Sequence, residues 1–260
     1  MYFKPLFLKI YEAANMQRWN DQIRAIEITE LDKQAHKMIV AYVLGKIEES
    51  QTNSKFIFDW VKIMQAGFFE YLQRIVLTDL KPPLFYEIKK DKKKYQKLNE
   101  WVYKKIYPVI ECMGEEFCNC FRSYILEEEK NLNFYKKIVG AAHFYVTKWE
   151  FDIICHFNPV GYQIEEIRKN IEKEQQNYSS LKCMQEFLSS KKLVSFINIC
   201  GQLRFQIRWS HIYRVPKTSV LGHMLIVAMF VYIFSYINKS PYKMQVNNYF
   251  TGLFHDLPEV

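Results

Sequence analysis

The chain has 260 residues and a mass of 31.4 kDa, enough for one large domain or two ordinary ones with a substantial hydrophobic core. Aromatic residues make up 17% of it, and Gly and Pro contribute only 8 residues each, which excludes global disorder and Gly/Pro-rich fibrous classes. The sequence has no Gly-x-Gly, which argues against a Rossmann or P-loop phosphate site. A net charge of +8 favours an anionic partner or serves only solubility.

Apolar residues recur at helical spacing along most of the chain, and alternating strand patterns are scarce. The pattern therefore predicts an all-α protein. In chain order, helices are expected over residues 35–49, 60–77, 101–127, 136–154, 163–176, 193–207, 221–237 and 249 to the end. Asp59 is the expected N-cap of the second helix, and Pro108 is expected to interrupt the third.

The cellular location is expected to be cytoplasmic, without a membrane partner. The longest apolar run, residues 225–237, is too short for a bilayer span, which needs about 20 residues. No secretory signal opens the chain, so its six cysteines are expected to be reduced. A zinc site at Cys112, Cys118 and Cys120 is disfavoured because the spacing lacks a Cys-x-x-Cys pair.

Three segments recur in the same order and at a nearly constant offset. Arg18-Trp19 recurs as Arg208-Trp209. The apolar helix that His36 opens resembles the helix that His223 opens, and segment 66–71 resembles segment 251–256. This predicts a tandem duplication with an incomplete second copy, because the first copy runs on far past the point where the second stops. The expected division is a degenerate module at 1–162, a charged helical connector at 163–190, and the N-terminal part of a motif-bearing module at 191–260.

Three residues suited to metal binding gather in the second copy. His223 opens one helix, and His255 and Asp256 are adjacent on the next. Neighbours on a helix point about 100° apart, so both can reach one ion, and a His from a packed helix can complete the set. Imidazole and carboxylate ligands suit a divalent ion such as Mn, Co, Zn, Fe or Mg.

This arrangement resembles the HD superfamily of metal-dependent phosphohydrolases, and within it the branch of bacterial 5'-deoxynucleotidases. The resemblance rests on Arg208-Trp209, Gly222-His223 and the run from Phe254-His255-Asp256 to Val260. It covers residues 205–260 well and 18–79 in degenerate form. It implies the following roles: Arg208 and Trp209 for substrate binding, His223, His255 and Asp256 for the metal, and Glu259 with Asp256 for catalysis, Glu259 as an acid/base or water-orienting group.

Two departures from the family pattern stand out. The last metal ligand, an Asp on a later helix, would lie beyond Val260, and the Leu-Thr-type stretch that follows the doublet is missing there. The first copy keeps Leu77-Thr78-Asp79 but has no His-Asp doublet, so it is expected to be catalytically dead. An altered metal site at His36, Glu70 and His143 is conceivable, but packing or capping roles are favoured for these residues.

The expected function is a metal-dependent phosphohydrolase that hydrolyses (deoxy)nucleotide phosphate monoesters in the complete protein, of which this chain would be a fragment. A small-molecule nucleotide is the expected substrate. The alternative is a non-enzymatic helical module that binds a nucleotide, RNA or a partner protein. A homo-oligomer stays open, and nucleic acid is a less favoured partner.

Overall fold

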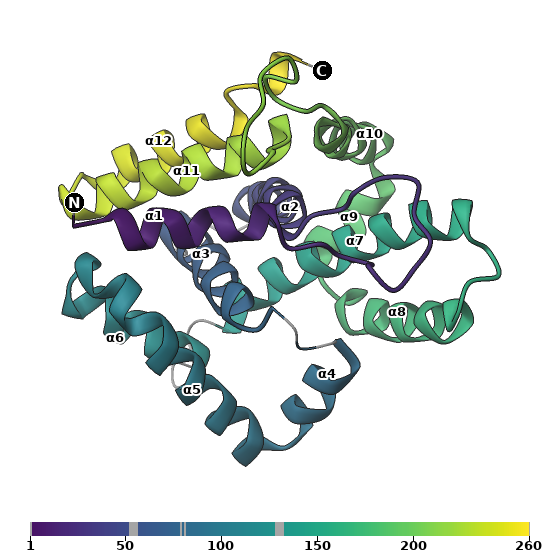
Figure 1. Ribbon diagram of the computed structural model, residues 1–260, viewed down its shortest axis with the longest axis horizontal. Helices are drawn as coiled ribbons and strands as arrows, with labels where there is room; N and C mark the ends of the chain where they lie inside the picture. The colour runs from purple at the N-terminus through teal and green to yellow at the C-terminus, as the bar shows by residue number, and fades with distance from the viewer. Residues whose placement is uncertain (1, 52–56, 79, 81, 128–132, 260) are drawn as a thin grey trace.

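The computed structural model describes residues 2–51, 57–78, 80, 82–127 and 133–259 (Figure 1). This part of the chain is all-α, as predicted, with two isolated β-bridges and no strand. Its α-helices are α1 (Lys4–Tyr11), α2 (Glu30–Gln51), α3 (Trp60–Val76), α4 (Pro82–Lys90), α5 (Lys92–Ile110), α6 (Glu115–Ile125), α7 (Asn133–Phe157), α8 (Ile164–Tyr178), α9 (Lys182–Ser189), α10 (Lys191–Gln202), α11 (Val220–Ile237) and α12 (Tyr242–Phe254). Short 3-10 helices lie at η1 (Glu12–Ala14), η2 (Glu111–Met113), η4 (Leu203–Phe205) and η5 (Leu257–Glu259).

Helix α2 forms the centre of the structure. It packs against α3, α7, α9, α10 and α11, which surround it in Figure 1. From Glu30 to Gly45 its side chains are buried, with Tyr42 alone half-buried. A helix that is apolar or paired on all sides is typical of a central position. One hydrophobic cluster includes residues from α1 through α12, so it joins the modules expected at 1–162 and 191–260. The boundaries of these modules stay a prediction.

Two helix ends show how local chemistry fixes the elements. Asp59 caps α3 as predicted, because its side chain accepts a hydrogen bond from the backbone N–H of Val61. Pro108 does not interrupt its helix: α5 continues to Ile110. The proline lies on the exposed side of α5, while Ile106 and Ile110 are buried and hold the last turn in place. The break falls instead at Gly114, whose φ of 92° suits a residue without a Cβ.

Helix α11 is longer than the apolar run in the sequence suggested. It has 18 residues and a mean hydropathy of 2.1, and among the described residues it is long and apolar enough to cross a membrane. However, 61% of it is buried inside the protein, where it packs on α12, α2 and α1. The core helix of a soluble protein passes the same test, so this is weak evidence for a membrane span.

The segments that precede α2 and α11 have the same local backbone. Isolated antiparallel bridges join Gln17 to Thr29 and Ile207 to Ser219. Trp19 and Trp209 each have a φ of 55°. A bulky residue in this left-handed region costs about 1–3 kcal/mol, so its occurrence at both tryptophans is a specific feature rather than ordinary loop geometry.

The side chains of the two segments repeat the same contact. Arg24 donates from its guanidinium to the carbonyl oxygen of Arg18, and Arg214 donates in the same way to the carbonyl oxygen of Arg208. Each closes its loop onto the residue before the tryptophan. The difference in residue number between Arg18 and Arg208 also separates the two bridges, the two left-handed tryptophans and the two hydrogen bonds.

This offset corrects one pairing expected from the sequence. Because α2 begins at Glu30 and α11 at Val220, His223 corresponds in position to Lys33 rather than to His36. The sequence suggested that His36 and His223 correspond because each is followed by a similar run of apolar residues.

Gly67 in α3 and Gly252 in α12 support the expected correspondence of segment 66–71 with segment 251–256. Gly67 lies against Met38, and Gly252 lies against Ala228. Met38 and Ala228 occupy corresponding positions of α2 and α11, because each is the ninth residue of its helix. The pairing of these glycines then places Glu70 at the position of His255, and Tyr71 at the position of Asp256.

Candidate metal centre

One group of possible metal ligands is present among the described residues. Its members are His223, His255 and Asp256, and each offers a ligand atom within 4.8 Å of the others. His223 lies in the first turns of α11. His255 is the C-cap of α12, and Asp256 follows it in a turn, so the doublet is not on a helix, contrary to the sequence-based expectation.

The close approach of α11 and α12 brings these residues together. A Cβ at Gly252 would lie 3.1 Å from the Cα atom of Ala228, so only glycine lets the two backbones pack at this distance without a shift. Ser219 caps α11 by accepting a hydrogen bond from the N–H of Gly222 at 2.8 Å, which fixes where the helix begins. His223 is the next residue, and its ring faces the end of α12.

The hydrogen bond of His255 determines which ring nitrogen is available. Its Nδ1 lies 2.8 Å from the carbonyl oxygen of Gly252. A carbonyl only accepts, so Nδ1 carries the proton and Nε2 has the free lone pair. That Nε2 lies 3.2 Å from Oδ1 of Asp256, and Nε2 of His223 lies 3.8 Å from Oδ2 of the same carboxylate. A carbonyl oxygen that accepts the other ring N–H, and so orients the imidazole, is typical of metal-binding histidines.

The electrostatics also suit a cation. Burial lowers the pKa of His223 to about 4, with a further contribution from the nearby guanidinium of Arg208. The imidazole is therefore neutral at pH 7, the form that binds a metal. The doublet lies at the C-terminal end of α12, where the helix dipole favours positive charge. The donor set of two imidazoles and a carboxylate fits a divalent ion.

A pocket of about 430 Å³ lies against Arg208 in the loop before α11. Arg208, Trp209, His211 and Val220 line it, together with Gln206, Ile207 and Ser210. The Arg208 guanidinium pairs with the Asp256 carboxylate, so the pocket and the metal-competent group are joined through this contact. Trp209 is 54% exposed and leaves an indole face open beside the pocket.

The structure brings together five of the six residues expected at the site. Glu259 lies in η5, but its side chain is outside the described residues, as is Asp79 of the first copy. Arg214, which fixes the loop by its hydrogen bond to the carbonyl oxygen of Arg208, is not among the residues expected from the sequence. A signal was present, because Arg-Trp-x4-Arg occurs at both 18–24 and 208–214.

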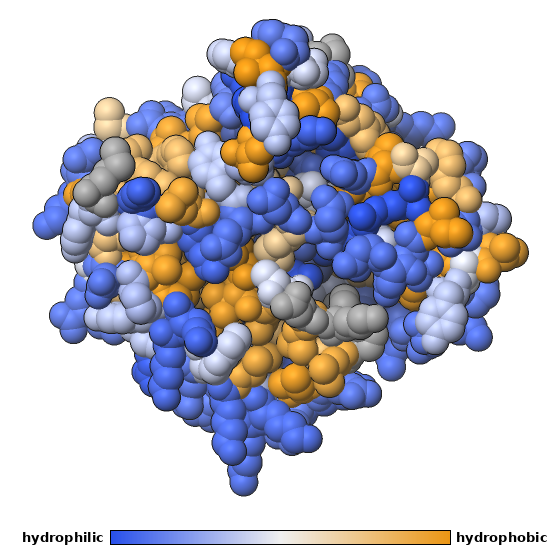
Figure 2. Space-filling view, in the orientation of Figure 1, coloured by the Kyte–Doolittle hydropathy of each residue, from blue (hydrophilic) through white to orange (hydrophobic). Residues whose placement is uncertain are grey.

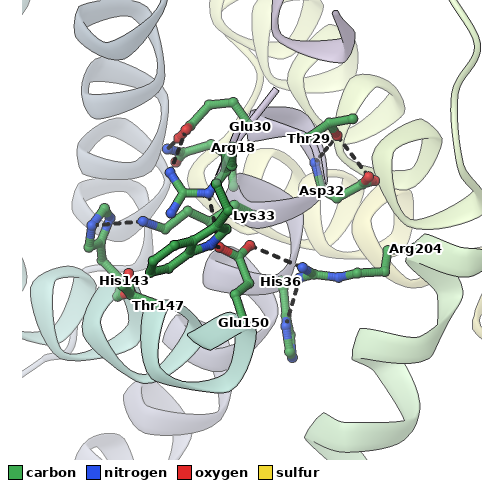
Figure 3. Close-up of polar contacts among 12 residues, drawn as sticks. Arg18, Thr29, Glu30, Asp32, Lys33, His36, His143, Thr147, Glu150 and Arg204 are labelled. Carbon is green, nitrogen blue, oxygen red and sulfur yellow. Dashed lines mark hydrogen bonds and ion pairs between the residues drawn. The ribbon is translucent and has the colours of Figure 1, made fainter. Parts of the chain in front are cut away.

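The N-terminal segment with the same local backbone, which the sequence predicts to be a first copy, adjoins a buried ionic network (Figure 3). Arg18 donates to Glu30 at 2.8 Å and to Glu150 at 2.9 Å, and the Trp19 indole N–H donates to Glu150 at 3.0 Å. The neighbouring guanidinium groups hold the pKa of both carboxyls below its usual range, against the effect of burial. The arginine that corresponds to Arg208 is thus already neutralised by the protein's own carboxylates.

The position that corresponds to His223 is also altered. Lys33 lies 3.0 Å from Nε2 of His143, and burial lowers the pKa of both groups well below their usual values. Glu70, at the position of His255, accepts hydrogen bonds from Lys37 and Tyr124. An amine thus occupies a ligand position, and Glu70 is engaged by other residues.

The same network ties η4 to α2 and α7. Arg204, in η4, donates to Glu150 at 3.0 Å and contacts Nδ1 of His36 at 3.2 Å, as Figure 3 shows. The Nε2 of His36 faces the carbonyl oxygen of Ile197 at 3.0 Å. Within the described part of the chain, His36, Glu70 and His143 therefore have separate partners and do not form a metal-competent group, which agrees with the packing roles favoured from the sequence.

Comparison with known proteins supports the assignment of the C-terminal part. Residues 200–260 match the family model of the HD domain, a segment that includes Arg208, His223, His255 and Asp256. Over this segment the chain is therefore similar to the HD domain. No curated protein and no solved structure gave a significant match.

Proposed function

We propose that the second copy is an HD-type site that binds a divalent metal and hydrolyses the phosphate monoester of a nucleotide. The observation that carries this proposal is the convergence of His223, His255 and Asp256 within 4.8 Å, beside an arginine and an exposed tryptophan. The 5'-deoxynucleotidase branch is part of the proposal, as is a cytoplasmic location, which the six free cysteines support.

The roles follow from the chemistry of each side chain. Nε2 of His223, Nε2 of His255 and the Asp256 carboxylate would hold the ion, which when bound supplies Lewis acidity toward a phosphoryl oxygen. Arg208 binds the phosphate, because a guanidinium can donate two parallel hydrogen bonds to it. Trp209 offers a flat surface for the base. Glu259 transfers the proton to or from the reacting oxygen.

We also propose that the chain arose by tandem duplication, with a first copy that lost its metal site. The repeated bridges and the left-handed tryptophans support a common origin. Lys33 and Glu70 support the loss, because each is engaged by other residues of the protein: Lys33 by His143, and Glu70 by Lys37 and Tyr124. The first copy then acts as a scaffold for the second.

The direct test is phosphate release from deoxynucleoside monophosphates, with Mn²⁺ or Co²⁺, by the complete protein, which the resemblance expects to supply the later Asp ligand. His255→Ala should abolish the metal-dependent release, because it removes one ligand and leaves the other two insufficient. His156→Ala, an exposed position near the end of α7, is the matched control and should retain the activity.

Metal binding is measured in parallel, for example by the absorption spectrum of Co²⁺. Release that persists in His255→Ala would overturn the proposal. Metal binding without release by the wild-type complete protein would overturn the enzymatic role and favour the alternative of a nucleotide-binding module.

A further inference from the structure

The positive charge of the chain is concentrated in one segment, separate from the candidate metal centre. Residues 87–105 carry eight lysines and three acidic residues, and so account for five of the eight net positive charges of the whole protein. They lie at the end of α4 and along α5, at the corner where hydrophilic side chains project in Figure 2.

Helix α5 separates its apolar and basic residues onto opposite sides. Asn99, Val102, Ile106 and Ile110 are buried on the side that packs on α3 and α6. At 100° per residue, the opposite side is an arc of about 120°. It holds Lys93, Lys94, Lys97, Trp101, Lys104 and Lys105, all of them exposed, which we call the lysine face.

The lysine face contains no carboxylate, and its lysines are little neutralised. Lys94 forms an exposed pair with Asp91 at 3.7 Å. Among the described residues, Lys93, Lys97 and Lys104 form no ion pair. A row of uncompensated amines over several turns repels itself, which is costly unless an extended anion lies along it.

The one aromatic residue on this face restricts the kind of anion. Trp101 is 45% exposed and lies one turn from Lys97 and one turn from Lys105, whose Nζ is 6.0 Å from its ring centre. An indole between phosphate-binding lysines is the arrangement that stacks on a base of a single strand. A membrane-surface helix needs an apolar stripe, but the aliphatic residues Val102, Ile106 and Ile110 are buried in the protein.

We propose that the lysine face of α5 binds single-stranded nucleic acid, with its lysines on the phosphates and Trp101 stacked on one base. This interaction does not depend on the metal centre. It gives the chain a second surface that binds phosphate groups, on α5 of the expected first copy.

The test is fluorescence anisotropy of the full chain with a labelled oligouridine of about 20 nucleotides, longer than single-strand site sizes of about 4–16 nucleotides. The triple variant Lys93→Gln, Lys97→Gln, Lys104→Gln should bind about tenfold more weakly or worse at low salt. It should also lower the slope of log affinity against log salt by about 2, since each lost phosphate contact contributes about 0.7. Trp101→Ala should weaken binding roughly five- to a hundredfold without changing that slope.

The matched control removes three exposed lysines elsewhere: Lys169→Gln, Lys173→Gln, Lys182→Gln, from α8 and α9. It changes the net charge equally and should keep wild-type binding. An equal loss in both triples would show that only net charge matters and would overturn the proposal. So would binding to phosphatidylserine vesicles without binding to RNA, or no binding to RNA by the wild type. Circular dichroism and Co²⁺ binding on each variant verify that the fold and the metal centre are intact.

Discussion

The guanidinium of Arg208 forms an ion pair with the carboxylate of Asp256, across the gap between the loop before α11 and the end of α12. The same carboxylate faces His223 and His255. Arg208 and a divalent cation would therefore compete for one anion. A metal that takes over Asp256 leaves the guanidinium free to bind a phosphate.

This competition predicts the behaviour of Arg208→Ala. The variant should bind Mn²⁺ several-fold more tightly, because a positive charge next to the ligands is gone. Its affinity for inorganic phosphate in the presence of Mn²⁺ should fall, because the main donor is lost. Isothermal titration with each ligand measures both effects. Lys217→Ala removes an exposed charge from the same loop and is the control. Weaker Mn²⁺ binding by Arg208→Ala would contradict the competition.

Metal binding should also stabilise the folded chain. A ligand at about 100 times its Kd adds about 2.7 kcal/mol, which is about 5–10 °C in Tm for a protein of this size. Thermal unfolding with and without Co²⁺ measures the shift. His223→Ala should remove it, whereas His211→Ala, an exposed histidine beside the same pocket, should preserve it. A full shift in His223→Ala would exclude this residue as a ligand.

Stability should decrease as the pH falls below about 6.5. Burial lowers the pKa of His36 to about 3 and that of His223 to about 4, whereas unfolded histidines titrate near 6.5. Between these values the unfolded chain binds more protons than the folded one, so acid favours unfolding. Each such histidine contributes about 1 kcal/mol per pH unit over its window.

Urea unfolding at pH 7 and pH 5.5 measures this slope. His36→Gln, whose amide can still donate to Ile197, should have a shallower slope than the wild type. His156→Gln is the control for loss of an exposed histidine. An unchanged slope in His36→Gln would show that this imidazole is not the source.

Glu150 is expected to be the most sensitive single position of the first copy. It accepts hydrogen bonds from Arg18, Trp19 and Arg204, and its side chain is fully buried. Glu150→Ala leaves two guanidinium groups without this partner, which costs about 3–5 kcal/mol. Asp152→Ala, which breaks the exposed pair with Lys148, should cost less than about 1 kcal/mol. Urea denaturation compares the two variants, and equal costs would contradict the proposed role of the network.

Local features of the sequence were sufficient for the all-α class but not for every element, since α1, α4 and α9 lie outside the ranges expected from the sequence. The helical periodicity of apolar residues predicted the all-α fold, and the Asp59 cap follows from its position before an apolar run. The residues of the metal-competent group were identifiable because a His-Asp doublet, an upstream His and an Arg-Trp pair occur together.

Features that depend on neighbours in space were not predictable in the same way. The break at Gly114 instead of Pro108 reflects the burial of Ile106 and Ile110, which holds the last turn of α5 together. The pairing of His223 with Lys33 became visible only when both helix starts were known.

The difference between Arg18 and Arg208 shows most directly what the sequence determined and what only the tertiary structure decided. The sequence determined that both arginines precede a tryptophan in the same motif. Only the tertiary structure decided that Arg18 is neutralised by Glu30 and by the distant Glu150, whereas Arg208 faces a pocket and Asp256. The charge and solvation of a side chain depend on what packs around it, so identical motifs acquire different chemistry.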